Sequence, residues 1–345
     1  MNLIEFGDCR ETMRRWAKEG IKAQMCVTSP PYFGLRDYGH EGQIGLEQTP
    51  EEYIAAMVEV FRCVWDVLED DGTLWLNIGD SYARQGGRES DQPRHWDGRE
   101  KTSGSLHGTR QAQDIGLKPK DLIGIPWMLA FALRADGWYL RQDIIWHKPN
   151  PMPESVRDRC TKAHEYLFLL SKSERYYFDS EAIKEPITDS TAIRMLQDIE
   201  NQKGSDRVPG KTNGTMKAVG RKPYTSDMAG GGSGVAGHSG YRQADGTLLI
   251  RPTRNKRSVW SVTTRPYKGA HFATFPPDLI EPCILAGSRI GDIVLDPFMG
   301  SGTTAQVALT HKRQYLGCEL NPEYKGLQDQ RIDSATDRQI DLFVA

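Results

Sequence analysis

The sequence predicts an α/β fold with a mainly parallel sheet, on the strength of three observations. Residues 23–28 form an apolar run that stops at two prolines. Residues 49–68 begin with a helix-capping sequence and continue with apolar side chains at helical spacing. Residues 291–319 have the pattern of a strand, a glycine-rich turn, a helix and a second strand. Such alternation of strands and helices is typical of layered α/β proteins.

The other elements follow from the same patterns along the chain. Apolar runs predict strands at residues 2–6, 23–28, 73–78, 140–146, 165–171, 291–295 and 313–319. Helical spacing predicts helices at residues 10–19, from 49 onward, at 122–134 and at 303–309. The strands at 140–146 and 165–171 are expected to pair antiparallel, which adds a hairpin to the parallel sheet.

The helix after Thr49 has the clearest start. Thr49 suits the N-cap, Pro50 suits the first turn, and Glu52 occupies the third helical position. The apolar side chains that follow predict one face packed on a core: Tyr53, Ile54, Met57, Val58, Phe61, Val64, Trp65 and Leu68. The dipeptide Asp71-Gly72 is expected to end this helix before the strand at 73–78.

Two stretches lack sustained apolar periodicity. Residues 84–116 are polar and rich in glycine and serine, and we expect a long mobile loop there. Residues 201–257 hold eleven glycines, eleven Lys or Arg and three Asp, so this stretch carries 11 − 3 = +8 charges. The whole chain carries −2, so the remaining residues carry −2 − 8 = −10. A basic segment on an acidic scaffold fits a nucleic-acid contact, although the glycines would also suit a linker.

The rest of the composition excludes several classes of protein. The six cysteines form no CxxC pair and the histidines no HExxH motif, so neither a metal site nor a disulfide framework is expected. The longest nearly apolar run, residues 123–133, is shorter than the roughly 20 residues that cross a membrane. We therefore expect a cytoplasmic protein whose cysteines are small buried side chains.

The first candidate site is the glycine-rich turn at residues 296–304, Asp-Pro-Phe-Met-Gly-Ser-Gly-Thr-Thr. It follows an apolar strand and opens a helix, and its glycines allow the backbone to approach a ligand closely. Glu319 stands at the end of the next strand, where an acid can accept hydrogen bonds from ribose hydroxyls. The order of strand, turn, helix, strand and acid predicts a nucleoside-containing cofactor. The turn matches neither GxGxxG nor GxxxxGK[ST], which disfavours NAD and P-loop nucleotides.

The second candidate site is the segment Ser29-Pro30-Pro31-Tyr32, directly after a buried strand. The prolines stop the strand and leave carbonyl groups that no neighbouring strand needs. A serine hydroxyl and the Pro30 carbonyl can together accept two hydrogen bonds from one exocyclic amino group, and Tyr32 offers a ring for stacking. Taken alone, the segment is equally consistent with a rigid turn.

Together the two motifs resemble those of the β group of DNA amino-methyltransferases. Ser29-Pro30-Pro31-Tyr32 resembles the catalytic motif of that family, and residues 296–302 resemble its Phe-x-Gly-x-Gly loop for S-adenosylmethionine. The catalytic motif precedes the cofactor loop, with a basic variable stretch between them, as in that group. Further matching segments are 7–9, 74–82, 146–150, 164–165 and 272–287. The resemblance implies a Rossmann-like S-adenosylmethionine-dependent methyltransferase fold with an inserted recognition region.

The resemblance also implies the ligand-binding residues. Asp296 should hold the amino group of the methionine part of the cofactor, Glu319 the ribose hydroxyls, and Asp8 with Cys9 the adenine edge. The other residues assigned to the cofactor are Phe272, Thr274, Pro276, Pro297, Phe298, Gly300, Ser301, Gly302 and Thr303. Double-stranded DNA is the implied substrate and partner. A separately encoded cognate restriction enzyme is the further partner that the family allows.

Three parts of the chain are expected from this resemblance. Residues 1–184 would form the catalytic part, 185–258 a target-recognition insertion, and 259–345 the cofactor-binding part. The residues expected to contact DNA are Lys148, Asn150, Arg251, Arg254 and Lys256. A proline-bounded turn explains Lys148 and Asn150 equally well.

The implied reaction is direct transfer of a methyl group to the exocyclic amine of a flipped-out base. Ser29 and Pro30 would accept hydrogen bonds from the amine and so free its lone pair. Serine at the first motif position goes mostly with cytosine N4 in the family, so we favour N4-cytosine and keep N6-adenine as the alternative. Methylation at cytosine C5 is disfavoured because the Pro-Cys motif is absent.

Two other classes of function remain as alternatives. Methylation of a protein glutamine or a small amine is disfavoured, because those enzymes place the cofactor loop before the catalytic motif. A DNA-binding module without catalysis is disfavoured by the intact Ser29, Tyr32, Asp296 and Glu319.

Overall fold

The computed structural model describes residues 1–35, 39–40, 42–83, 115–188, 240–242, 248–250, 252–264 and 275–344. The chain divides into two compact units, one of Met1–Asp179 with Arg257–Ala345 and one of Ser180–Lys256.

The large unit is built on an eight-stranded sheet with the order β1-β12-β11-β2-β3-β5-β4-β10. The strands are β1 (Asn2–Phe6), β2 (Ala23–Thr28), β3 (Leu68–Ile78), β4 (Tyr139–His147), β5 (His164–Ser171), β10 (Val259–Ser261), β11 (Ile293–Asp296) and β12 (Gln314–Glu319). Strand β5 runs antiparallel to β3 and β4, and the other pairs are parallel. The mainly parallel sheet with an antiparallel β4–β5 hairpin is confirmed.

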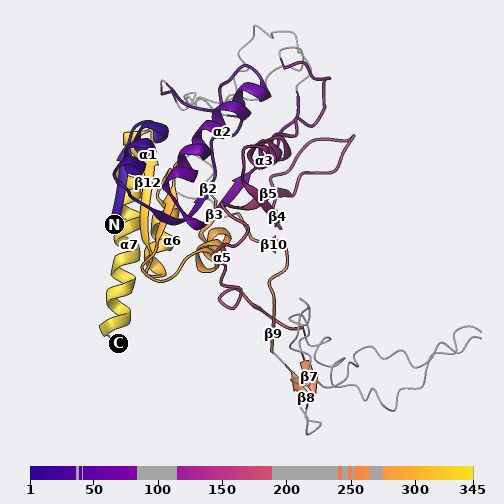
Figure 1. The fold of residues 1–345 in the computed structure, drawn as a ribbon. Helices are drawn as coiled ribbons and strands as arrows, with labels where there is room; N and C mark the ends of the chain where they lie inside the picture. The colour runs from indigo at the N-terminus through magenta and orange to yellow at the C-terminus, as the bar shows by residue number, and fades with distance from the viewer. Residues whose placement is uncertain are drawn as a thin grey trace, which may run out of the picture. The chain divides into compact units, whose positions relative to one another are not determined.

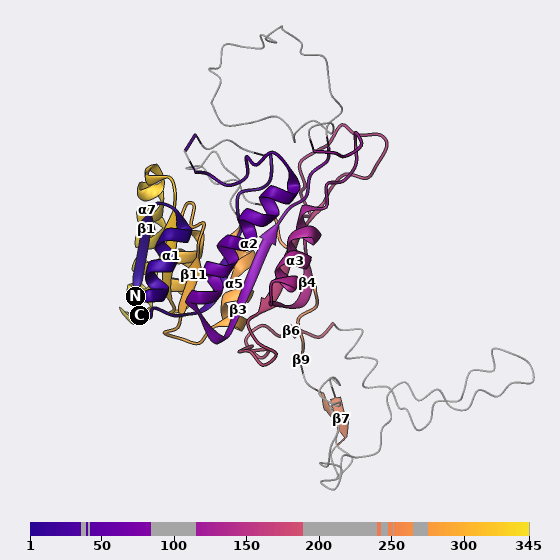
Figure 2. The same cartoon turned by 45° about the horizontal axis from the view of Figure 1, so that its top comes forward.

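Helices cover both faces of this sheet (Figures 1 and 2). The helices are α1 (Cys9–Lys18), α2 (Pro50–Val67), α3 (Ile125–Ala135), α5 (Pro277–Gly287), α6 (Thr303–Thr310) and α7 (Lys325–Val344), with a 3-10 turn at Pro322–Tyr324. Helix α2 packs between α1 and α3, and α6 packs between α5 and α7. Helices α5 and α7 were not among the predicted elements.

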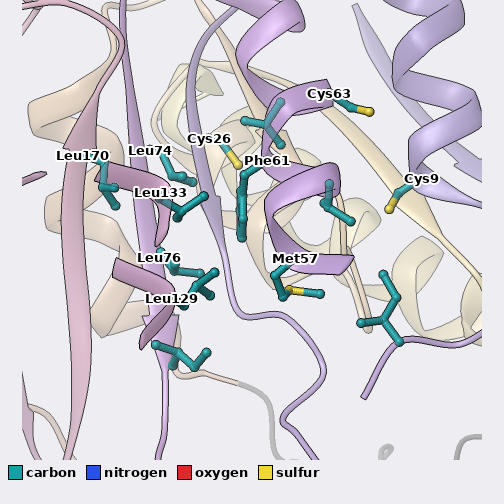
Figure 3. Close-up of a cluster of buried hydrophobic side chains, with 14 of the residues drawn as sticks. Cys9, Cys26, Met57, Phe61, Cys63, Leu74, Leu76, Leu129, Leu133 and Leu170 are labelled. Carbon is teal, nitrogen blue, oxygen red and sulfur yellow. The ribbon is translucent and has the colours of Figure 1, made fainter. Parts of the chain in front are cut away.

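The buried side chains of β3 alternate between the two faces of the sheet. Leu74 and Leu76 of β3 belong to the cluster under α1, α2 and α3, whereas Trp75 between them does not. This alternation is the period of two expected of a strand. Figure 3 shows Met57 and Phe61 of α2 among these buried strand side chains. Because all of these residues are buried, the sheet is apolar on both faces, as parallel sheets usually are.

The predicted end of helix α2 is wrong. The capped start is as expected, since the Thr49 hydroxyl accepts a hydrogen bond from the Glu52 N–H at 3.2 Å. The helix ends at Val67, and Asp71-Gly72 lies inside β3. Leu68 already pairs with Ala23 of β2, so sheet pairing ends the helix before the turn-like dipeptide is reached. A Cβ atom at Gly72 would lie 2.8 Å from the Glu69 carbonyl oxygen, so the glycine serves close backbone packing.

The cysteine prediction needs one correction. All six cysteines are free, and five are buried. Cys160 is exposed, because it lies in the loop between β4 and β5 rather than in the core.

The small unit, Ser180–Lys256, contains two short antiparallel ladders within its described residues. Strand β6 (Glu185–Pro186) pairs with β9 (Thr253–Arg254), and β7 (Gly240–Arg242) pairs with β8 (Leu248–Ile250). The unit overlaps the expected recognition insertion at 185–258, and that role stays a prediction. Most of the basic stretch 201–257 and nearly all of the expected loop at 84–116 lie outside the described residues.

Candidate active site

One cavity of about 920 Å³ opens at the edge of the sheet where the parallel strands end. The segments after β1, β2 and β11 and the last residues of β3, β4 and β12 line it. Ligands of open α/β sheets usually bind at this carboxyl edge. Strand β5 runs the opposite way, so it contributes its first residues, His164 and Glu165, to the same edge.

The two predicted motifs lie in this one cavity. We call the part formed by Asp8, Cys9, the loop at 297–303 except Gly302, and Glu319 the cofactor end. Gly302 does not line the cavity. We call the part formed by Ser29, Pro30, Tyr32, Lys148 and Glu165 the base end.

At the cofactor end, the glycine loop follows β11 and begins α6. Gly302 has a φ of +87° and stands at the N-cap of α6, a conformation that suits glycine. A Cβ atom on Gly302 would lie 3.2 Å from the Cα atom of Gln328. Helix α7 also holds the loop directly, because the Gln328 side-chain amide donates to the Gly300 carbonyl at 2.8 Å. The loop is therefore fixed from behind and presents its other side to the cavity.

Asp296 lies behind this loop and does not line the cavity. One carboxylate oxygen accepts from the Thr28 hydroxyl at 2.6 Å and the Phe298 N–H at 3.0 Å, and the other accepts from the Thr304 hydroxyl at 2.6 Å. Burial raises the pKa of Asp296 to about 6, although these hydrogen bonds favour the ionised form and by themselves lower the pKa. Asp296 thus shapes the loop, and its direct contact with a cofactor stays a prediction.

Glu319 sits at the end of β12 and faces the cavity, although only 9% of it is exposed. Its two carboxylate oxygens accept the N–H groups of Gly300 at 2.7 Å and Asn321 at 2.9 Å. Burial raises the pKa of this carboxyl group. Each oxygen keeps a second lone pair, so the carboxylate can still accept hydrogen bonds from a diol.

The remaining described cofactor candidates divide between the cavity wall and the structure behind it. Pro297, Phe298, Gly300, Ser301 and Thr303 line the cavity. The Ser301 hydroxyl is buried and makes no hydrogen bond within the described structure, which fits a polar ligand group.

Asp8 and Cys9 line the cavity at the start of α1. Asp8 caps this helix by accepting the Arg10 N–H at 2.7 Å. Burial opposes ionisation of Asp8, but the hydrogen bonds and charge of Arg10 lower its pKa overall. Burial raises the pKa of the Cys9 thiol to about 12, so it stays neutral.

Two of the other cofactor candidates cannot be placed, and the third lies beside the cavity. Phe272 and Thr274 lie outside the described residues. Pro276 is buried at the N-cap of α5, and its neighbour Phe275 lines the cavity instead.

At the base end, Ser29-Pro30-Pro31-Tyr32 leaves β2 and turns along the cavity wall. The Pro31 carbonyl accepts the Tyr53 hydroxyl at 2.8 Å. The Pro30 carbonyl accepts no hydrogen bond from the described part of the chain. Among the described residues, the Pro30 carbonyl is therefore left as an acceptor beside Ser29, and the role of both groups in holding an amine stays a prediction.

Tyr32 is held by its phenol group. The hydroxyl donates to Glu165 Oε2 at 2.8 Å and lies 3.4 Å from Asn77 Oδ1. Burial and the Glu165 charge raise the pKa of Tyr32 well above its usual value, so the phenol stays neutral. A Cβ atom on Gly79 would lie 2.7 Å from the Tyr32 ring, so glycine there makes room for it.

The residues expected to contact DNA lie in different places. Lys148 reaches the base end, where its ammonium group pairs with Glu165 and lies 4.3 Å from the centre of the Trp146 ring. Asn150 exchanges two hydrogen bonds with the backbone of Thr264, at 3.0 and 3.1 Å.

The other three belong to the basic stretch. Arg254 pairs with Glu185 in the small unit, and Lys256 also lies in that unit. Arg251 lies outside the described residues. All five DNA contacts stay predictions.

Sequence reasoning did not assign a role to three polar residues in the cavity wall: Asn77, Lys162 and Glu165. The Lys162 ammonium donates to the Asp80 carbonyl, and burial lowers the pKa of this lysine. Glu165 was part of a matching segment, but only the reversed direction of β5 brings it to the carboxyl edge. The predicted antiparallel hairpin was therefore the feature of the sequence that could have placed Glu165 at the site.

The described residues include no cluster of three metal-ligating side chains, and none of their helices is long and apolar enough to cross a membrane.

Comparison with known proteins identifies relatives over nearly the whole chain. A family profile described as DNA methylase, for N6 and N4 enzymes, matches residues 23–328. Type II methyltransferase M.SmaI from Serratia marcescens is 44% identical over 95% of this chain and 90% of its own length. Type II methyltransferase M.XycI from Xanthomonas campestris pv. cyanopsidis is 42% identical over 98% of this chain and 90% of its own length.

Solved structures share the fold at low sequence identity. The cytosine-N4-specific PvuII DNA methyltransferase superimposes with a TM-score of 0.55 at 16% identity, over 97% of this chain and 90% of its own. A putative DNA modification methylase from Thermus thermophilus, complexed with S-adenosyl-L-methionine, superimposes with a TM-score of 0.53 at 19% identity. The match covers 97% of this chain and 94% of the other. The chain therefore belongs to the DNA methylase family of N6 and N4 amino-methyltransferases, and S-adenosylmethionine is its methyl donor.

Proposed function

We propose that this protein methylates the exocyclic N4 amine of a flipped-out cytosine at a specific site in double-stranded DNA. The observation that carries the proposal is that Ser29 and Pro30 share one cavity with Glu319 and the glycine loop. A methyl donor at one end and an amine at the other can therefore meet without leaving the protein, which is the arrangement that direct transfer needs.

The base end supplies the hydrogen bonds that this amine needs. The lone pair of an exocyclic amine is delocalised into the ring, so the amine is a weak nucleophile. Hydrogen bonds donated by its two N–H groups to Ser29 Oγ and the Pro30 carbonyl favour a more tetrahedral nitrogen. The lone pair can then point at the methyl group, and correct orientation provides much of the rate enhancement.

S-adenosylmethionine supplies, when bound, a methyl group activated by a sulfonium charge. Glu319 would hold its ribose hydroxyls, Asp8 and Cys9 would face its adenine, and the loop at 297–303 would follow its methionine part. The buried, unpaired Ser301 hydroxyl supports a polar ligand at this place. Asp296 would act through the loop that it shapes, because it does not line the cavity and its oxygens bond to Thr28, Phe298 and Thr304 behind the loop.

DNA recognition is assigned to the insertion at 185–258. The +8 charge of residues 201–257 supports it, since phosphate contacts by Lys and Arg dominate the affinity of most DNA-binding proteins. Arg251, Arg254 and Lys256 would contribute there. Lys148 is better placed to meet the flipped base than a phosphate, because it lies in the cavity wall. Asn150 would position the neighbouring loop.

Adenine N6 remains the alternative acceptor. Ser29 favours cytosine, by the correlation of serine with N4 transfer in the family. Both bases place a ring nitrogen acceptor beside the amine, but cytosine adds a second acceptor, O2, where adenine has C2–H. Lys148 is a donor only, which suits the cytosine edge.

Nucleoside analysis tests the proposal. DNA is incubated with the protein and S-adenosylmethionine, digested and analysed by mass spectrometry. We expect N4-methylcytosine. N6-methyladenine would favour the alternative, and the absence of methylated nucleosides would contradict transfer to DNA. The names of the relatives also point to a cognate restriction enzyme, which would be tested by protection of methylated DNA from cleavage.

A further inference from the structure

A charged pair lies in the base end of the cavity, and the proposed reaction does not use its carboxylate. The side chains of Glu165 and Lys148 are only 15% and 19% exposed. Removing two charges from water costs several kcal/mol each, and their mutual attraction offsets this cost only when the geometry is good. A pair kept in such a place calls for an explanation beyond stability.

The sheet places this pair against the catalytic motif. Glu165 on β5 lies opposite Trp146 on β4, and Lys148 follows two residues after Trp146. The Lys148 ammonium group lies over the Trp146 ring, 4.3 Å from its centre, and this cation–π contact limits its positions. Both side chains come from rigid elements or their immediate ends, so the positions of their charged groups are well defined.

The two oxygens of Glu165 have different partners. Oε2 accepts the Tyr32 hydroxyl at 2.8 Å, with the Asn77 amide nitrogen farther away at 3.4 Å. Oε1 accepts the Lys148 ammonium group. Gly79 lies directly beneath this contact, since a Cβ atom there would be 2.7 Å from Tyr32 and 3.3 Å from Glu165.

Resting on the function proposed above, we propose that Glu165 is a positioning residue for the target base. One carboxylate oxygen fixes the Tyr32 ring through its phenol, and the other fixes the Lys148 ammonium group, so that both stay aligned with Ser29 and Pro30. The ring then offers a stacking face. The ammonium group donates to the ring nitrogen beside the amine or, in cytosine, to O2. Glu165 thus couples the stacking contact to the hydrogen-bonding edge of the pocket.

Four substitutions separate the two contacts of Glu165, the phenol arm to Tyr32 and the ammonium arm to Lys148. Tyr32→Phe removes the hydroxyl but keeps the ring, and Lys148→Met removes the ammonium group but keeps an unbranched side chain. Glu165→Ala removes both arms. Glu165→Gln keeps an oxygen acceptor for Tyr32 but places an NH₂ donor where the other oxygen accepts the Lys148 ammonium group, so it removes the charge and the Lys148 contact together. Asp158→Asn is the matched control, because Asp158 pairs with Lys120 on the exposed surface at 2.7 Å.

The measurements are kcat and KM on duplex DNA, affinity for S-adenosylmethionine, and the melting temperature. We expect Glu165→Ala to lower kcat about 100-fold, the cost of misplacing a reacting group by roughly 1 Å. Glu165→Gln should recover part of that loss. Cofactor affinity should be unchanged, and Asp158→Asn should match wild type throughout. Tyr32→Phe should cost little when added to Glu165→Ala, because both remove the same arm.

Other outcomes would overturn the inference. Wild-type kcat in Glu165→Ala would show that the carboxylate positions nothing. Independent, additive losses from Tyr32→Phe and Glu165→Ala would show that Glu165 does not act through the phenol. If Glu165→Ala does not fold, the cycle of Lys148→Met with Glu165→Gln decides instead, because both remove the pairing of Glu165 with the ammonium group. Additive losses in that cycle would show that Glu165 does not act through Lys148. Absence of methyl transfer by the wild type would instead overturn the proposed function, and this inference with it.

Discussion

The carboxylates around the cofactor loop and the Ser29-Pro30 segment of the base end differ in how far the chain satisfies their hydrogen-bonding capacity. At the cofactor end, both oxygens of Asp296 and both oxygens of Glu319 accept hydrogen bonds from the protein. At the base end, the Pro30 carbonyl has no donor among the described residues, and the nearest partner of the Ser29 hydroxyl is Tyr32 at 3.5 Å.

This difference matches the two functions proposed for the cavity, which are binding a cofactor and holding the amine of a base. A cofactor site gains from a backbone fixed in advance, because each hydrogen bond formed before binding reduces the entropy lost on binding. A site that must take hold of an amine needs acceptors that are still free. Variants at the cofactor end should therefore lose cofactor affinity, whereas variants at the base end should lose turnover.

The largest effect is expected from Gly79→Ala at the base end. The new Cβ atom would lie 2.7 Å from the Tyr32 ring and 3.3 Å from Glu165, so the ring must move. We expect kcat on duplex DNA to fall about 100-fold, because the base wall no longer lines up with Ser29. Affinity for S-adenosylmethionine, measured by calorimetry, should stay within twofold of wild type. A parallel loss of cofactor affinity would show that the two ends are not separable.

The next largest effect is expected from Glu319→Gln at the cofactor end. Both oxygens of Glu319 accept backbone N–H groups, so an amide must turn its NH₂ group toward one of two donors. The amide also offers the ribose hydroxyls fewer acceptor sites than the carboxylate. Losing one hydrogen bond to a charged group costs about 1.5–3 kcal/mol, so we expect affinity for S-adenosylmethionine to fall roughly 10- to 100-fold. At saturating cofactor, kcat should recover most of its wild-type value. A kcat that stays low at saturation would show that Glu319 also acts on the transfer step.

Much of this architecture could be predicted from local sequence patterns. The strand at 23–28 and the capped start of α2 depend on neighbouring residues alone, and both were predicted correctly. The end of α2 was not, because pairing of Leu68 with Ala23 is a contact between distant parts of the chain. Local propensity does not report such pairing, so the turn-like dipeptide Asp71-Gly72 led to a helix end that was predicted too late in the chain.

The candidate site shows the same limit. The motifs at 29–32 and 296–302 place their residues in one cavity because both follow parallel strands. The contacts that decide each role were not readable from the motifs. The Asp296 carboxylate lies behind the loop, and Glu165 reaches Tyr32 only because β5 runs against its neighbours. Spacing indicates which residues gather at the edge of a sheet, but packing decides which atoms face the ligand.

A smaller effect is expected from pH through Asp296. Burial raises the pKa of this carboxyl to about 6 in the folded protein, above its ordinary value of 3.8. The folded state therefore binds more protons than the unfolded state between these values, and this residue makes folding less favourable as pH rises through that window. The loss is at most about 3 kcal/mol, at 1.4 kcal/mol per pKa unit.

Asp296→Asn tests this dependence. The amide does not titrate, so the difference in free energy of unfolding between wild type and variant should change in the variant's favour from pH 4 to pH 7. Urea denaturation at several pH values measures it. A constant difference across this range would show that Asp296 is not the titrating group.

The smallest effect is expected from Lys162→Ala, which tests whether the base end has an electrostatic part that the cofactor end lacks. Lys162 lines the cavity, and its ammonium donates to the Asp80 carbonyl, with no carboxylate within ion-pair distance among the described residues. Burial lowers its pKa, as expected for a cation removed from water without full compensation. A DNA phosphate beside the flipped nucleotide would supply that compensation.

We expect the Lys162→Ala variant to bind DNA about three- to tenfold more weakly at low salt, and the slope of log affinity against log salt to drop by about one. Lys120→Ala, which removes an exposed lysine paired with Asp158, is the matched control. An unchanged salt slope would mean that Lys162 meets no phosphate, and that the base end recognises the nucleotide through its base alone.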